Sequence, residues 1–300
     1  MTKYEVNQKV YVKASNDSHI IISRYTYTLI AFAILTSIIN LIIGNKLLVI
    51  AFLKSLLITI ITTSIIKYII NITKKKYNPL DIYTKDNTIA IAIILALFGI
   101  NTNTYILIIS SIVSIVIESY TKNINLSSTL YGILLIMLYN MYTGNLITID
   151  LNQPLKEIIT SSGGLINMLF SIENLSPILS IIMFIYLFYK KGIKYNIVIY
   201  MILTFTLTIF IYSAIKSNMG IFLIKIFTTP IIFLTIYTLT DYKCSPTINE
   251  TCMIYGILMG LITALLSIIS PIFIPITFII GSLLITKILD KFSYKIKYKK

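Results

Sequence analysis

The chain has very few charged residues for its length. Of its 300 residues only 12% are Asp, Glu, Lys or Arg, whereas 57% are hydrophobic. A soluble domain is about 25% charged and about 45–50% apolar. Because so few charges cannot cover a water-exposed surface, the composition excludes a soluble fold and indicates a protein embedded in the lipid bilayer.

The residues that build metal and redox centres are also scarce. The chain has one histidine, His19, so it cannot form a tri-His metal site or a bis-His haem site by itself. Its two cysteines, Cys244 and Cys252, are too few to hold an iron–sulfur cluster without a second subunit, which favours structural thiols. The absence of a Walker loop and of a GxGxxG motif leaves nucleotide binding without local support.

What the sequence has in abundance is apolar segments. A helix needs about 20 apolar residues to cross the hydrocarbon core, and the pattern predicts an all-α polytopic membrane protein with about ten transmembrane helices. The predicted spans are residues 25–43, 47–72, 88–100, 104–119, 129–143, 177–189, 197–215, 220–239, 252–269 and 272–287. The third, fifth and sixth are the shortest. They are expected to be half-helices that line a buried site, or tilted helices in a thin part of the bilayer.

Basic residues occur in alternate gaps between these spans. Lys74–Lys76, Lys190–Lys194 and the tail Lys291–Lys300 are rich in lysine, whereas Asn101–Asn103 has none. Since basic loops stay on the cytoplasmic side, an even number of spans with both termini cytoplasmic fits the series. The net charge of +14 therefore reflects the topology of a multi-pass protein of the cell membrane, and no nucleic acid partner is expected.

The pattern divides the chain into five regions. They are a cytoplasmic N-terminal arm (1–24), a first membrane half of five spans (25–143), an extracytoplasmic loop (144–176), a second membrane half of five spans (177–287) and a basic cytoplasmic tail (288–300). If the two halves are repeats they must be inverted, because an odd number of crossings reverses the direction of the chain.

Few charged side chains fall within the predicted spans. Lys67 and Lys225 lie near span ends and are expected to extend to the headgroups. Lys54 lies deeper and Glu118 ends the fourth span. An ionisable group in the membrane is a functional candidate, although the long stem of Lys54 favours the same extension to the headgroups. The absence of a dense chain of Asp, Glu and His disfavours a proton pump based on carboxylate relays within this chain.

Two polar turns differ from simple connections. Residues 81–88 lead into the third span, and residues 240–247 join the eighth and ninth. Asp86 and Thr88 are expected to cap the third span, because their oxygens can accept hydrogen bonds from the first free amides. Ordinary capping would account for the residue types in both turns. The alternative is a functional site at the cytoplasmic end of the core.

The second turn carries a family resemblance. Residues 240–247, followed by residues 254–263, resemble the C-terminal signature of the NqrB/RnfD membrane family. This family comprises the B subunit of the sodium-pumping NADH:quinone reductase and the D subunit of Rnf electron transport complexes. Weaker matches follow the family's order at residues 13–20, 86–97, 123–126 and 186–195. The resemblance extends over nearly the whole chain.

The resemblance implies a subunit of a membrane-bound, translocase-type oxidoreductase complex rather than a stand-alone enzyme. Electrons would pass through flavin, FMN or riboflavin, and their transfer would be coupled to movement of Na⁺ or H⁺. The partners would be the other membrane subunits of an Rnf/Nqr-type complex and the lipid bilayer. The residues implied at the cofactor site are Ser162, Gly163, Asp86, Thr88, Thr240, Asp241 and Ser245.

Covalent flavin is a separate question. Family members attach FMN by a phosphoester to the threonine of an S-G-A-T motif in the outside loop between the fifth and sixth spans. If Ser162 and Gly163 correspond to the first two residues, Leu165 occupies the acceptor position. Because leucine has no hydroxyl, covalent attachment is not expected. The alternative for Gly163 and Gly164 is a flexible turn.

Two other functions stay open. One is a non-redox transporter built on inverted repeats, with its substrate at broken helices. The other is a divergent structural subunit that has kept the fold and lost its flavin.

Overall fold

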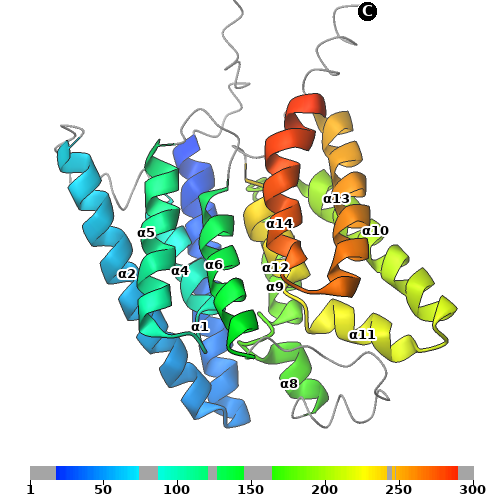
Figure 1. The fold of residues 1–300 in the computed structure, drawn as a ribbon, viewed down its shortest axis with the longest axis horizontal. Coiled ribbons are helices and arrows are strands. Elements are labelled where there is room, and N and C mark those ends of the chain that lie inside the picture. The colour runs from blue at the N-terminus through cyan, green and yellow to red at the C-terminus, as the bar shows by residue number, and fades with distance from the viewer. Residues whose placement is uncertain are drawn as a thin grey trace, which may run out of the picture.

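The computed structural model describes residues 18–73, 87–120, 127–144, 164–241, 245–246 and 248–289, with side chains from residue 21 onward. Within these ranges every regular element is a helix (Figure 1). The elements are α1 (Ser18–Ile43), α2 (Lys46–Thr73), α4 (Thr88–Phe98), α5 (Thr104–Tyr120), α6 (Ser128–Tyr142), α8 (Leu165–Phe170), α9 (Pro177–Tyr189), α10 (Tyr195–Ile215), α11 (Met219–Phe227), α12 (Ile231–Leu234), η1 (Thr235–Leu239), α13 (Asn249–Ile269), α14 (Phe273–Ile280) and η2 (Gly281–Ile285).

Each of the ten predicted spans corresponds to a helix or a broken helix in the described part of the chain. Four helices, α1, α2, α10 and α13, are long and apolar enough to cross a membrane, and α11 with α12 and η1 forms a fifth, bent span. The other apolar helices are shorter. The all-α polytopic class is therefore confirmed. The five-region division of the chain stays a prediction, as does the side on which the termini lie.

The sharpest break lies in the eighth span. Its two parts, Met219–Phe227 and Ile231–Leu239, meet at an angle of 46°. Pro230 stands at the junction, where its ring cannot continue the helix and it offers no amide hydrogen. The predicted half-helix at the third span fits α4, whose 11 residues extend about 17 Å, roughly half of the hydrocarbon core. The break at Pro230 was not predicted.

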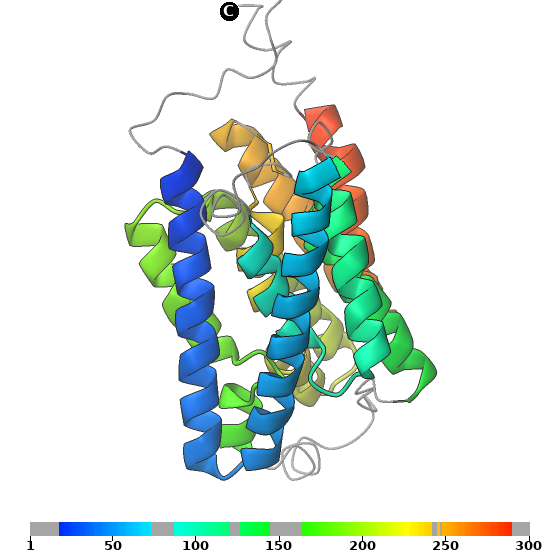
Figure 2. The ribbon, with the colours of Figure 1, turned by 90° about the vertical axis from the view of Figure 1, so that its left-hand side faces the viewer.

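The two halves repeat one packing pattern. In the first half α2 packs on α4 and α5, α5 on α6, and α1 on α4. In the second half α10 packs on α11 and α13, α13 on α14, and α9 on α12. Successive spans alternate in direction (Figure 1 and Figure 2), so the two sets of five run opposite to each other. This arrangement agrees with the predicted inverted repeats.

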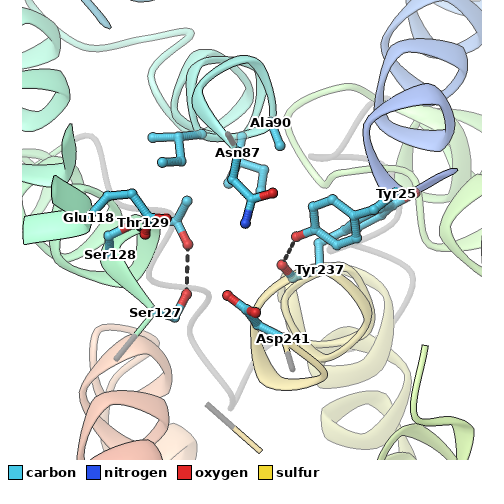
Figure 3. A pocket seen from close by; sticks show the side chains of 11 residues that line it. Tyr25, Asn87, Ala90, Glu118, Ser127, Ser128, Thr129, Tyr237 and Asp241 are labelled. Carbon is cyan, nitrogen blue, oxygen red and sulfur yellow. Dashed lines mark hydrogen bonds between the residues drawn. The ribbon is translucent and has the colours of Figure 1, made fainter. Parts of the chain in front are cut away.

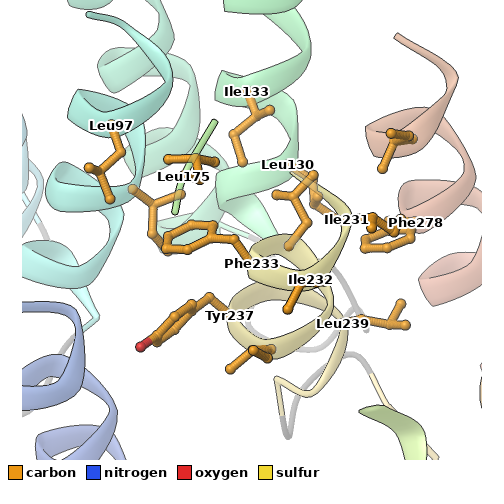
Figure 4. Close-up of a cluster of buried hydrophobic side chains, with 14 of the residues drawn as sticks. Leu97, Leu130, Ile133, Leu175, Ile231, Ile232, Phe233, Tyr237, Leu239 and Phe278 are labelled. Atoms are coloured by element: carbon orange, nitrogen blue, oxygen red, sulfur yellow. The ribbon is translucent and has the colours of Figure 1, made fainter. Parts of the chain in front are cut away.

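The broken span forms the centre of the molecule. All residues from 231 to 240 are buried. Phe233 packs against Phe32 of α1, with ring centroids 5.1 Å apart, and against Phe98 of α4 at 6.3 Å. Figure 4 shows these α12 side chains between residues of α4, α6 and α14. The second part of the broken span is therefore packed on several sides.

Two lysines within spans behave differently from the prediction. Lys225 is only 7% exposed and donates a hydrogen bond of 2.6 Å to the carbonyl oxygen of Ser267, near the end of α13. Lys67 is also buried. The predicted extension of these two side chains to the headgroups is wrong, because neighbouring helices cover both. Lys54 is exposed on α2, as expected.

Candidate functional site

Polar side chains from five elements meet in one small pocket (Figure 3). The pocket is lined by Tyr25 of α1, Asn87, Ala90, Ile91 and Ile94 at α4, Glu118 of α5, Ser127, Ser128 and Thr129 at the start of α6, Tyr237 of η1, and Asp241. These positions are the starts of α1, α4 and α6 and the ends of α5 and η1, at one end of the bundle (Figure 1). The cavity volume is about 20 Å³. This is room for a water molecule or a small ion.

The pocket brings the two predicted polar turns together. Asp241 comes from the turn after the eighth span, and Asn87 comes from the turn before the third. Figure 3 shows the carboxylate of Asp241 and the amide of Asn87 directed toward each other across the pocket. Asp86 lies outside the described residues, as do Ser162 and Gly163.

The start of α4 has unused hydrogen-bonding groups. Asn87 is the N-cap residue, but its side chain makes no capping bond, and the hydroxyl of the buried Thr88 has no hydrogen-bond partner in the described part of the chain. The predicted capping by Thr88 is therefore wrong. Asn87 Oδ1 is likewise buried without a partner among the described residues. Since buried polar groups are normally satisfied, this end of α4 is equipped for a ligand.

The opposite wall is made of hydroxyls and carboxylates. Ser128 Oγ donates to Glu118 Oε2 over 3.1 Å, and the hydroxyls of Ser127 and Thr129 are 2.8 Å apart. These groups come from the end of α5 and the start of α6, which pack against each other. The result is a cluster of oxygen atoms beside Asp241.

Two aromatic side chains, Tyr25 and Tyr237, also line the pocket. Tyr237 packs edge-on against Tyr25, with ring centroids 5.3 Å apart, and on Phe233 at 4.7 Å. The Tyr25 hydroxyl donates a hydrogen bond to the carbonyl oxygen of Tyr237. Tyr237 belongs to the π-helical turn η1, and such turns occur frequently at functional sites. Because η1 ends at Leu239, the carbonyl of Tyr237 lies in the last turn and is available as an acceptor.

Two other predicted site residues support the backbone instead of lining the pocket. Thr240 Oγ1 donates to the carbonyl oxygen of Ile236 over 2.6 Å, and Ser245 Oγ donates to that of Asp241 over 2.8 Å. Both side chains are buried. They therefore shape the turn that presents Asp241.

Sequence reasoning missed several lining residues. Glu118 was noted only as a charge at the end of a span, and Ser127–Thr129 follow the weakly matching segment 123–126. Tyr25 and Tyr237 lie near span ends, where tyrosines are common for reasons of membrane solvation. Only the packing of α1 against the broken span distinguishes them.

A family model described as the NQR2, RnfD, RnfE family matches residues 6–280, which is nearly the whole chain. The chain belongs to this family. The predicted resemblance is thereby confirmed, and membership makes the chain a membrane subunit of Rnf/Nqr-type complexes. A search of curated proteins gives no significant match.

The described residues do not fit the covalent flavin of this family. Leu165 begins α8 with its side chain 57% exposed, and it has no hydroxyl. The described hydroxyls that follow, Ser171 and Ser176, are buried, and Ser176 accepts the capping bond at the start of α9. The pocket at Asp241 is much smaller than a flavin ring. Flavin binding stays a prediction.

Proposed function

We propose that this chain is the membrane subunit of an ion-translocating electron transport complex of the Rnf/Nqr type, and that its polar pocket holds the transported cation, Na⁺ or H⁺. In this proposal the pocket faces the cytoplasm, because the lysine-rich gaps of the sequence lie at the same end of the spans. Any FMN or riboflavin on the chain is held without an ester at Leu165, and when bound it supplies the electron transfer.

The observation that carries the proposal is the set of oxygen atoms around a water-sized cavity. Glu118 and Asp241 contribute carboxylates, and Asn87 contributes an amide oxygen that accepts no bond from the described residues. Hard cations prefer oxygen ligands of this kind. Ionisable groups in membrane proteins commonly mark ion pathways.

The position of the pocket also supports ion coupling. It lies where a short helix, α4, begins and where a broken span ends. In inverted-repeat transporters, access to the coupling ion alternates through movement of one repeat against the other. Here the two walls of the pocket come from different halves of the chain, so relative movement of the halves would open or close it.

The test is the ion dependence of electron transfer through the whole complex in native membranes. Asp241→Asn and Glu118→Gln are expected to raise the Na⁺ concentration at half-maximal rate, or to displace the pH profile if H⁺ is the coupled ion. Glu250→Gln, at the exposed start of α13, is the matched control. Unchanged Na⁺ and pH dependence in both pocket variants would refute the pocket as an ion site.

The broken span favours one alternative, a transporter without redox function. Its substrate would bind at the same junction between the halves. Uptake of a small solute into liposomes in the absence of any electron donor would support this alternative, whereas ion movement that requires electron transfer would support the first proposal.

A further inference from the structure

The turn between α9 and α10 contains a lysine with a specific set of partners. Lys194 Nζ donates to the carbonyl oxygen of Ser245 at 3.1 Å, to Ser245 Oγ at 2.8 Å and to the carbonyl oxygen of Pro246 at 2.7 Å. An ammonium group has three N–H donors, and these three bonds all go to one short segment. Lys190 and Lys191 in the same turn are exposed. The positive charge of this turn is expected for a cytoplasmic connection. A cytoplasmic location does not by itself require the three bonds of Lys194.

The segment that Lys194 binds leads directly to the pocket. Ser245 Oγ accepts a bond from Lys194 and donates its own hydrogen to the carbonyl oxygen of Asp241 over 2.8 Å. Ser245 and Pro246 are buried, and Cys252 of α13 adds a bond to the carbonyl oxygen of Pro246 at 3.2 Å. Buried carbonyl groups without partners would be costly. The Lys194 ammonium therefore keeps this turn packed against the bundle.

We propose that Lys194 is a positioning residue that holds the Asp241 carboxylate at the pocket by way of Ser245. Lys194 lies in the connection between α9 and α10. Its side chain does not line the cavity. Arginine is a poor substitute, because its planar group cannot aim three donors at acceptors clustered around one point. The binding of an ion in the pocket rests on the proposed function, whereas the positioning of Asp241 by Lys194 does not.

The test uses the whole complex in native membranes and a hydrophobic carbodiimide, with the modification of Asp241 and of Glu118 quantified by mass spectrometry. Lys194→Gln is compared with Lys190→Gln, which removes the same charge from the same turn. Because Glu118 belongs to α5 and is bonded to Ser128 of α6, general loosening would change the labelling of both acids. The proposal expects the Asp241-to-Glu118 labelling ratio to change about tenfold in Lys194→Gln and to stay within about twofold of the parent in Lys190→Gln.

Ser245→Ala keeps the proposal testable if Lys194→Gln does not accumulate. It is expected to change the same ratio in the same direction, and the double variant should show little further change, since both act through one path. Equal ratios in Lys194→Gln and Lys190→Gln, or independent effects of Lys194→Gln and Ser245→Ala, would overturn the proposal. So would an unchanged ratio in Ser245→Ala.

Na⁺ separates this inference from the proposed function. If Na⁺ protects Asp241 in the parent, the half-protecting concentration is expected to rise about tenfold in Lys194→Gln and not in Lys190→Gln. If neither Na⁺ nor pH affects labelling in the parent, the ion site fails, whereas the labelling ratio still decides the role of Lys194.

Discussion

Substituting Gly260 tests the packing that holds the second half together. The Gly256 and Gly260 face of α13 lies against α10, in the small-xxx-small arrangement that lets membrane helices approach closely. A Cβ at Gly260 would overlap Thr204 Oγ1 and lie 2.6 Å from the backbone carbonyl oxygen of Met201. Rotation of Thr204 could relieve the first overlap. The second involves backbone, so α10 and α13 would have to separate.

The expected cost follows from two opposing effects. Overpacking of this kind costs about 1–3 kcal/mol, and the backbone contact places Gly260→Ala at the upper end. Alanine in a helix regains about 1 kcal/mol over glycine. The net destabilisation is therefore about 2 kcal/mol. At Gly256 the nearest atom is the Ile197 carbonyl oxygen at 2.9 Å, a milder contact, so in Gly256→Ala the two effects should nearly cancel.

The assay is thermal unfolding of the purified complex in detergent, followed by alkylation of Cys252, which is buried at the start of α13. A loss of about 2 kcal/mol corresponds to a midpoint lower by about 5 °C. Gly256→Ala serves as the matched control with the same substitution on the same face. A larger loss in Gly256→Ala than in Gly260→Ala, or no loss in either, would refute the packing argument.

Four further outcomes are expected. Asp241→Asn should weaken assembly or electron transfer more than Glu173→Gln, because only Asp241 lines the pocket; equal activities would count against this. Tyr25→Phe should cost about 1 kcal/mol in the same unfolding assay, because it loses its bond to the backbone of η1; no change would show that the bond is not formed. Lys225→Met should destabilise less than Lys225→Ala, because both lose the bond to Ser267 and only methionine fills the buried volume; the reverse order would show that this volume is not packed. The parent should show no acid-stable flavin fluorescence in denaturing gels, and such a band would establish an ester at a residue other than Leu165.

Much of the fold could be predicted because membrane helices obey a length rule. Apolar segments bounded by polar gaps mark each span, and all ten predicted intervals contain helix. The break was missed although Pro230 is a local signal for it, because the residues on both sides continue the apolar pattern of a single span. Such a segment resembles a lipid-facing span, although here it is covered by protein. Its π-helical turn depends on packing and has no local signal.

The sequence indicated the two turns of the candidate site but not their proximity. The turn at Asp241 stood out because a carboxylate next to a span is unusual, and Asn87 adjoins the other predicted turn. Their meeting could not be inferred, since it depends on how the two halves pack. The burial of Lys225 was missed for the same reason, because a lysine near the end of a span usually reaches the headgroups.

Carbodiimide modification of Asp241 in the intact complex, measured against Na⁺ concentration and pH, tests the ion site most directly. The account predicts that Na⁺ slows the reaction while K⁺ at equal ionic strength does not, or that protons govern it if H⁺ is coupled, and that Asn87→Ala weakens this effect. A labelling rate on which Na⁺ has no more effect than K⁺, together with a pH profile that Asn87→Ala leaves unchanged, would contradict it.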